Sequence, residues 1–193
     1  MKATPATSEM NIYLTNHANV RNTTFTDDFG QVLYKSETPG SILSRNRKTT
    51  ISKIVPSESP DDMADHFTEL AIIEWHTVAS SVLTYGGVKQ SMKEFMPHKG
   101  VLAQNRGFTA PGDGRAFKWK LGMWTCSLIL DDGSKTPVAE GHRSNAGVVG
   151  SRRQARLEIF PGFEHLVDVI LVTFVFVEKL RKERERAAES SGG

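Results

Sequence analysis

The sequence contains very little cysteine and almost no excess of charge of either sign. Cys126 is the single cysteine among 193 residues. One thiol can neither close an internal disulfide nor supply the cysteine ligands of a zinc site, so both kinds of scaffold are excluded. The 24 Lys and Arg residues and the 22 Asp and Glu residues leave a net charge of +2. Such a weak net charge excludes bulk, histone-like binding of nucleic acid.

Long hydrophobic runs and targeting signals are also lacking. Residues 1–11 are polar and do not show the apolar core and small-residue cleavage site of a signal peptide. The most apolar stretch, 166–177, includes Asp168 and is shorter than the roughly 20 apolar residues that a bilayer span needs. We therefore expect a cytoplasmic protein in a reducing compartment, without a transmembrane segment and with peripheral membrane association at most.

Motifs that would indicate a cofactor or a metal are missing too. The glycine-rich segments 111–115 and 147–150 have neither the Walker spacing nor the three-glycine dinucleotide pattern. The six histidines are scattered, without the close spacing of a helical metal-binding pair. The sequence therefore predicts no cofactor, no metal and no specific nucleic-acid partner.

Short β-prone runs make up most of the chain. They alternate in polarity or carry β-branched and aromatic residues, and Gly, Pro and Asp separate them. The runs lie at residues 23–26, 31–37, 48–55, 70–76, 81–85, 106–110, 116–120, 124–130, 136–142 and 155–160. About nine to twelve strands at this close spacing are typical of an antiparallel meander, sandwich or barrel.

The stretch 166–177, which follows these β-prone runs, is apolar on nearly every side. Residues 166–177 follow Pro161 and precede a run rich in Lys, Arg and Glu, which favours a helix, although the β-branched content would also fit a strand. A helix that is apolar all round must be buried all round. We therefore expect a mostly β fold in which a closed antiparallel β-barrel surrounds one hydrophobic C-terminal helix. Closure would leave no strand edge open.

Several segments together resemble a family of unknown function that is abundant in mushroom-forming fungi, the basidiomycetes. They are DDFGQVLY at 27–34, IEWH at 73–76, RGFT at 106–109, FKWK at 117–120, LEI at 157–159 and the stretch 168–181. The family is remotely similar to the tubby C-terminal-like superfamily, with its LURP-one-related proteins and phospholipid scramblases. The resemblance implies a closed barrel around a hydrophobic helix and no established activity. In the tubby branch, basic side chains hold phosphoinositide head groups.

One domain is expected from the length of the chain, since domains usually have about 100 to 200 residues. Residues 1–20 have no apolar period, so we predict a flexible N-terminal arm there. Residues 21–188 are predicted to form a single tubby-like barrel domain with its core helix, and residues 189–193 a disordered tail.

Glu74 and His76 are the candidate catalytic pair. They lie two residues apart in a strand pattern, so both would point to one face, where a carboxylate and an imidazole can do acid and base chemistry. A purely structural pair is the competing interpretation, because Trp75 between them would pack in the core. A small enzyme with an acid/base site at Glu74 and His76 is the alternative function.

Basic residues are concentrated in segments that contain no acid. Segments 38–57 and 141–157 have several Lys and Arg residues and no Asp or Glu. If the two segments lie close together they form a positive patch, whereas an ordinary solvated surface is the competing interpretation. The predicted anion-binding residues are Arg45, Arg47, Lys48, Arg152 and Arg153. We therefore expect a noncatalytic binding module for an anionic phospholipid head group or a protein partner. The sequence gives no indication of the oligomeric state.

Overall fold

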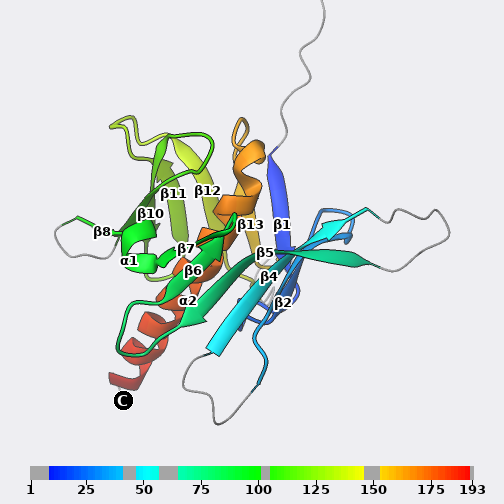
Figure 1. The fold of residues 1–193 in the computed structure, drawn as a ribbon, viewed down its shortest axis with the longest axis horizontal. Coiled ribbons are helices and arrows are strands. Elements are labelled where there is room, and N and C mark those ends of the chain that lie inside the picture. The colour runs from blue at the N-terminus through cyan, green and yellow to red at the C-terminus, as the bar shows by residue number, and fades with distance from the viewer. Residues whose placement is uncertain (1–8, 41–46, 57–64, 101–104, 146–152, 192–193) are drawn as a thin grey trace, which may run out of the picture.

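The computed structural model describes residues 9–40, 47–56, 65–100, 105–145 and 153–191 (Figure 1). Within these residues one 13-stranded antiparallel sheet has the order β7-β6-β5-β4-β3-β2-β1-β13-β12-β11-β10-β9-β8. The strands are β1 (Met10–Leu14), β2 (Thr23–Thr26), β3 (Val32–Glu37), β4 (Arg47–Val55), β5 (His66–Trp75), β6 (Val82–Tyr85), β7 (Val88–Ser91), β8 (His98–Lys99), β9 (Asn105–Thr109), β10 (Ala116–Leu121), β11 (Cys126–Leu130), β12 (Pro137–His142) and β13 (Arg156–Ile159). Two meanders are therefore joined where β1 pairs with β13.

The mostly β prediction is confirmed. Each of the ten predicted β-prone runs overlaps a strand of the sheet. Alternation explains this agreement, because residues two apart in a strand point to the same face. In β10, for example, Phe117, Trp119 and Leu121 are buried while Lys118 and Lys120 are more exposed.

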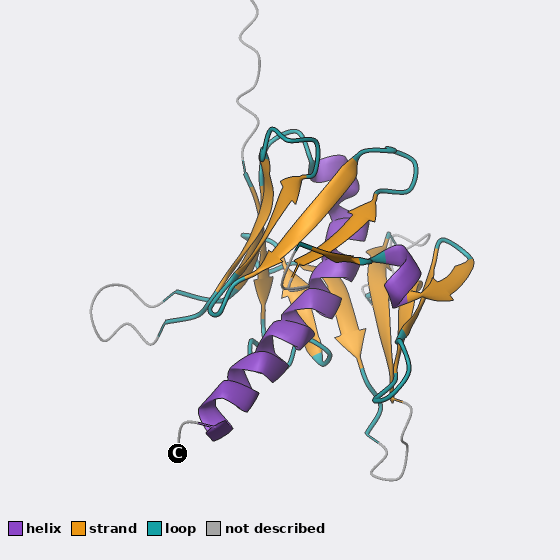
Figure 2. Ribbon diagram, turned by 90° about the vertical axis from the view of Figure 1, so that its left-hand side faces the viewer, coloured by secondary structure: helices purple, strands orange, loops and turns teal. Residues whose placement is uncertain are grey.

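The predicted hydrophobic helix is present and lies in the core. A 3-10 turn, η1 (Glu164–Leu166), leads into α2 (Val167–Ser191), and every residue from Val169 to Val177 is buried. Figure 2 shows the first half of α2 crossing between strands on either side, while its last turns extend beyond them. Side chains on all faces of this half contact the sheet, which explains an apolar pattern without a polar stripe. No helix in the described part of the chain is long and apolar enough to span a membrane.

The prediction of a closed barrel is wrong, because the sheet is open between its terminal strands β7 and β8. Ser91 and Glu94 form a capping box that starts the short helix α1 (Met92–Phe95) directly after β7. The chain therefore forms a helical turn at the position where an extended strand would be needed to close the sheet. Phe95 packs against Phe108 of β9 with a ring-centroid distance of 6.0 Å, so α1 covers part of the opening.

The predicted flexible arm is wrong for its last part, whereas residues 1–8 lie outside the described residues. β1 occupies the middle of the sheet, and its Ile12 and Leu14 are buried in the core. The predicted tail is also partly wrong, because α2 continues to Ser191. The pairing of β1 with β13 thus ties the beginning of the described chain to the strand that precedes the core helix.

Candidate functional site

Six chain segments join neighbouring strands at the edge of the sheet where the second half of α2 projects, which we call the helix-exit edge. They are residues 15–22, 38–46, 76–81, 100–104, 122–125 and 143–155, of which 41–46, 101–104 and 146–152 lie outside the described residues. None of the six contains Asp or Glu in the sequence. At this edge, the helix is therefore the main source of acidic side chains.

The opposite edge, in contrast, carries many acids. Four of the five segments that join strands there contain acids, and those among the described residues are Asp27, Asp28, Asp65, Asp113, Asp131 and Asp132. The strand topology therefore separates charge along the molecule even though the net charge is only +2. Local potential, and not net charge, decides what such an edge attracts.

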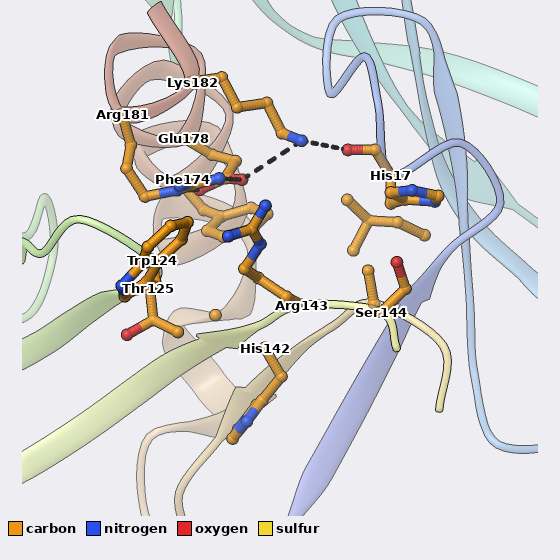
Figure 3. Close-up of a pocket in the computed structure, with 13 residues that line it drawn as sticks. His17, Trp124, Thr125, His142, Arg143, Ser144, Phe174, Glu178, Arg181 and Lys182 are labelled. Carbon is orange, nitrogen blue, oxygen red and sulfur yellow. Dashed lines mark hydrogen bonds and ion pairs between the residues drawn. The ribbon is translucent and has the colours of Figure 1, made fainter. Parts of the chain in front are cut away.

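A pocket of about 180 Å³ lies at the helix-exit edge, between α2 and the segments 15–22, 122–125 and 143–155 (Figure 3). Leu14, Ala155 and Phe174 contribute apolar lining. The polar and aromatic lining comprises His17, Trp124, Thr125, His142, Arg143, Ser144, Glu178, Arg181 and Lys182. Helix α2 and strand-joining segments far apart in the sequence thus present several nitrogen donors to one cavity.

Arg181 is the buried centre of the charge network beside this pocket. Its guanidinium bonds both oxygens of Glu178 at 2.8 Å and donates to Glu185 Oε2 and to the carbonyl oxygen of Met123 at 3.0 Å. Burial opposes the charge of Arg181, but the hydrogen bonds to Glu178 and Glu185 raise its pKa above the ordinary value. These neighbours occupy four of the five N–H donors of Arg181, and the side chain is only 2% exposed, so Arg181 holds the site in place and is not the main group for a ligand.

Arg143 is the most available guanidinium of the pocket. One terminal nitrogen lies 2.6 Å from Glu185 Oε1, and the side chain is 45% exposed. Its Cζ lies 5.0 Å from the centre of the Trp124 ring, in cation–π contact. A guanidinium carries five N–H donors in a planar fork, so the contact with Glu185 leaves donors for an anion.

Lys182 and Arg153 add positive charge near the segment 15–22. Lys182 Nζ donates to the carbonyl oxygen of His17 and lies 3.8 Å from Glu178 Oε1. Burial lowers the pKa of Lys182. Arg153 lines an adjoining groove of about 650 Å³ that shares His17 and Ser144 with the pocket. Among the described residues, Arg153 has no acidic partner.

Two of the predicted anion-binding residues lie elsewhere on the same edge. Arg47 is opposite Trp75 in the β4–β5 pairing, and the adjacent Lys48 forms a 3.1 Å ion pair with Glu74. Near Trp75, Lys179 Nζ lies 4.7 Å from the ring centre, and Arg21 has a pKa lowered by burial and by Arg47. A second cluster of cations therefore surrounds Trp75.

The predicted five-residue site is not a single constellation. Strands β3, β2 and β1 separate β4, which carries Arg47 and Lys48, from the strand β13 that follows Arg153. Arg45 and Arg152 lie outside the described residues. The structure therefore places the three described members on one edge, in two clusters.

Glu74 and His76 do not contact each other through any hydrogen bond or ion pair of the described residues. Lys89 and Lys48 bind Glu74 Oε1 at 3.0 and 3.1 Å, and their hydrogen bonds lower the pKa of Glu74. His76 Nδ1 lies 3.0 Å from the carbonyl oxygen of Ser80. An ionised carboxylate shared by two lysines is a structural arrangement and lacks the raised pKa of a general acid.

The sequence interpretation missed Lys182, His17 and Trp124 as parts of one site. In the run 179–186 glutamates alternate with the basic residues, a pattern typical of an exposed helix with charge pairs along it and not of a binding site. Helical spacing was the available signal, because Glu178, Arg181, Lys182 and Glu185 lie three or four residues apart and so share a face. No group of three or more His, Cys, Asp and Glu side chains that would hold a metal occurs among the residues that the structure describes.

Comparison with known proteins relates the chain to a family but not to an activity. A crystal structure of a protein from Arabidopsis thaliana has 15% sequence identity and a TM-score of 0.39, over 91% of this chain and 93% of that one. No curated protein matches the chain. The model of a family of unknown function, DUF6593, matches residues 18–183. The chain therefore belongs to this family of unknown function (DUF6593).

Proposed function

We propose that the domain is a noncatalytic module that binds anionic phospholipid head groups at the pocket of the helix-exit edge. The observation that carries this proposal is the grouping of Arg143, Lys182 and Arg153 around a continuous pocket and groove on an edge whose strand-joining segments have no acid. Arg143 and Arg153 would grip a phosphate through paired hydrogen bonds, and Lys182 would act as a point charge.

The charge balance of the pocket favours an anion. Arg143, Arg181 and Lys182 face Glu178 and Glu185, which leaves one positive charge, and Arg153 in the adjoining groove adds another. Each basic residue near an anionic membrane contributes about 1 kcal/mol of attraction. The cluster around Trp75, with Arg47 and Lys179, adds to the same field.

A cytoplasmic protein that associates peripherally with membranes fits this proposal. The expected remote relation to tubby-like proteins, in which basic side chains hold phosphoinositides, supports the same class of ligand. The proposal does not extend to catalysis, because Glu74 and His76 have separate structural partners.

Vesicle co-sedimentation tests the proposal. We expect the protein to sediment with phosphatidylcholine vesicles that contain phosphatidylserine, and not with pure phosphatidylcholine vesicles. Raising the salt from about 50 to 200 mM should weaken the binding, because salt screens exposed charges. The triple variant Arg143→Gln, Arg153→Gln and Lys182→Gln should lose most of the binding while keeping polar side chains.

A matched variant controls for net charge. Lys35→Gln, Lys89→Gln and Lys93→Gln remove the same number of charges from β3, β7 and α1, away from the pocket. This control should bind as the unchanged protein does. Equal binding to both kinds of vesicle, or an equal loss of binding in the triple variant and its control, would contradict the proposed site. Binding to neither kind of vesicle would redirect the search to a protein partner.

A further inference from the structure

Exposed apolar side chains accompany the cations of the helix-exit edge. Among the described residues the exposed large apolar side chains are Phe29, Val78, Val88, Met123 and Trp124. Three of these, Val78, Met123 and Trp124, lie in segments of the helix-exit edge. Met123 is 67% and Trp124 57% exposed, next to each other in the segment 122–125. Exposed apolar groups that gather beside cations indicate an interaction surface.

The segment 122–125 is held in a fixed shape. Arg181 donates a 3.0 Å hydrogen bond to the carbonyl oxygen of Met123. A Cβ added at Gly122 would lie 2.8 Å from the carbonyl oxygen of Thr125, so the turn is too tight for a side chain there. Arg143 covers the Trp124 ring from the pocket side. These contacts present the Met123 and Trp124 side chains outward and beside the anion pocket.

We infer that Met123 and Trp124 insert into the interfacial region of an anionic bilayer while Arg143, Lys182 and Arg153 contact its head groups. This inference rests on the proposed function and adds an orientation to it: the helix-exit edge faces the membrane. A tryptophan ring has an apolar body and a polar N–H, which suits the boundary between head groups and acyl chains.

The combination of groups distinguishes a membrane surface from a dissolved anion. A dissolved phosphate requires only cations, whereas apolar burial together with attraction to anionic lipids is how peripheral proteins bind membranes. The acid-free segments complement the negative charge of such a surface. The bilayer is therefore the occupant that fits both the cations and the exposed Met123 and Trp124.

Tryptophan fluorescence gives a direct test because the three Trp residues differ in exposure. Trp75 is 6% and Trp119 0% exposed, compared with 57% for Trp124. Acrylamide quenching of the unbound protein should therefore come mainly from Trp124. Vesicles containing phosphatidylserine should shift the emission to shorter wavelength and reduce this quenching. Brominated phospholipids should quench the bound protein, and Trp124→Phe should abolish both effects.

The affinity for vesicles gives a second readout. Met123→Ser combined with Trp124→Ser should weaken binding by about tenfold, because insertion buries part of two large apolar side chains. Phe29→Ser removes an aromatic ring that is 90% exposed at the opposite edge, and this control should leave the affinity unchanged. Glycerol phosphate, a dissolved phosphate ester, should leave the acrylamide quenching of Trp124 unchanged.

The outcomes separate this inference from the proposed function. If the protein sediments with anionic vesicles while Trp124 stays open to acrylamide, the head-group site stands and the insertion is wrong. If glycerol phosphate protects Trp124 as well as vesicles do, a dissolved ligand replaces the bilayer and the insertion is also wrong. If no vesicle binds, the proposed function fails and the inference fails with it.

Discussion

At the scale of single residues, Arg181 determines the shape of the pocket. Its side chain is 2% exposed and joins Glu178, Glu185 and the carbonyl oxygen of Met123. A buried ion pair contributes little compared with an apolar substitute, but removing one partner leaves the other charge uncompensated. The pocket therefore depends on Arg181 although this residue is not itself the main group for a ligand.

We predict that Arg181→Ala lowers the free energy of unfolding by about 3–5 kcal/mol, because two largely buried carboxylates lose their main partner. Arg184→Ala is the matched control on an exposed position of the same helix, and its effect should stay within about 0.5 kcal/mol. Urea unfolding of both variants measures the difference. Equal effects would show that the Arg181 network does not stabilise the fold.

The acid stability should depend on Glu185. Burial opposes its charge, but Arg181 and Arg143 hold the pKa of Glu185 below the ordinary value of 4.5. A group with a lowered folded-state pKa stabilises the fold fully above its unfolded-state pKa, and this stabilisation is lost as the pH falls through the folded-state pKa. The unchanged protein should therefore lose stability below about pH 5 more steeply than Glu185→Gln does.

Urea unfolding at a series of pH values provides the comparison. Other acids with lowered pKa values, such as Asp113 and Asp131, contribute the same loss to both proteins. The difference between the two pH curves therefore isolates Glu185. Parallel curves for the unchanged protein and Glu185→Gln would contradict the ion-pair network at the pocket.

At the scale of elements, α2 combines a buried half with an exposed, charged half. Phe174 belongs to the buried half, lies 6.1 Å from the Trp119 ring centre and also lines the pocket. We predict that Phe174→Ala lowers the free energy of unfolding by about 3–5 kcal/mol, because it leaves a cavity in a packed core. Thermal and urea unfolding measure this loss of stability. Phe29→Ala, at an exposed position, is the control and should change the free energy of unfolding little.

The sequence predicts the long elements well and the short ones poorly. The alternation of Met10, Ile12 and Leu14 is a correct strand signal in β1. It spans only five residues, so the polar, loop-like composition of residues 1–20 dominates the prediction for this segment. α1 and β8 have only four and two residues, so no periodic pattern exists to be recognised. The sheet is open because α1 follows β7 and the two-residue strand β8 does not pair with β7. Since neither short element can be recognised in the sequence, the sequence pattern predicts a closed barrel.

The candidate site was predicted in part for a similar reason. Segments without acids can be read from the sequence, and the acid-free segment 141–157 predicts Arg153 as a binding residue, although Arg143 of the same segment is not among the predicted residues. Which segments share an edge depends on strand order, and the pairing of β1 with β13 brings His17 beside Ser144. The association of Lys182 with this pocket depends on the rotation of α2 within the sheet, which the sequence pattern does not specify.

At the scale of the whole molecule, strand order converts a nearly neutral composition into two different edges. The segments that join strands at the helix-exit edge have no acid, and four of the five at the opposite edge contain Asp or Glu. The expected result is a molecule that approaches a negative surface with one edge only. The apolar pair Met123 and Trp124 lies on that same edge.

Amide hydrogen exchange in the presence and absence of anionic vesicles tests this orientation most directly. We predict that the vesicles slow exchange in segments 15–22, 122–125 and 153–155, because bound lipid excludes water from the helix-exit edge. Segments 27–31, 110–115 and 131–136 at the opposite edge should exchange at the same rate with and without vesicles. Slowed exchange at the opposite edge, or vesicle binding with no change at the helix-exit edge, would contradict the account.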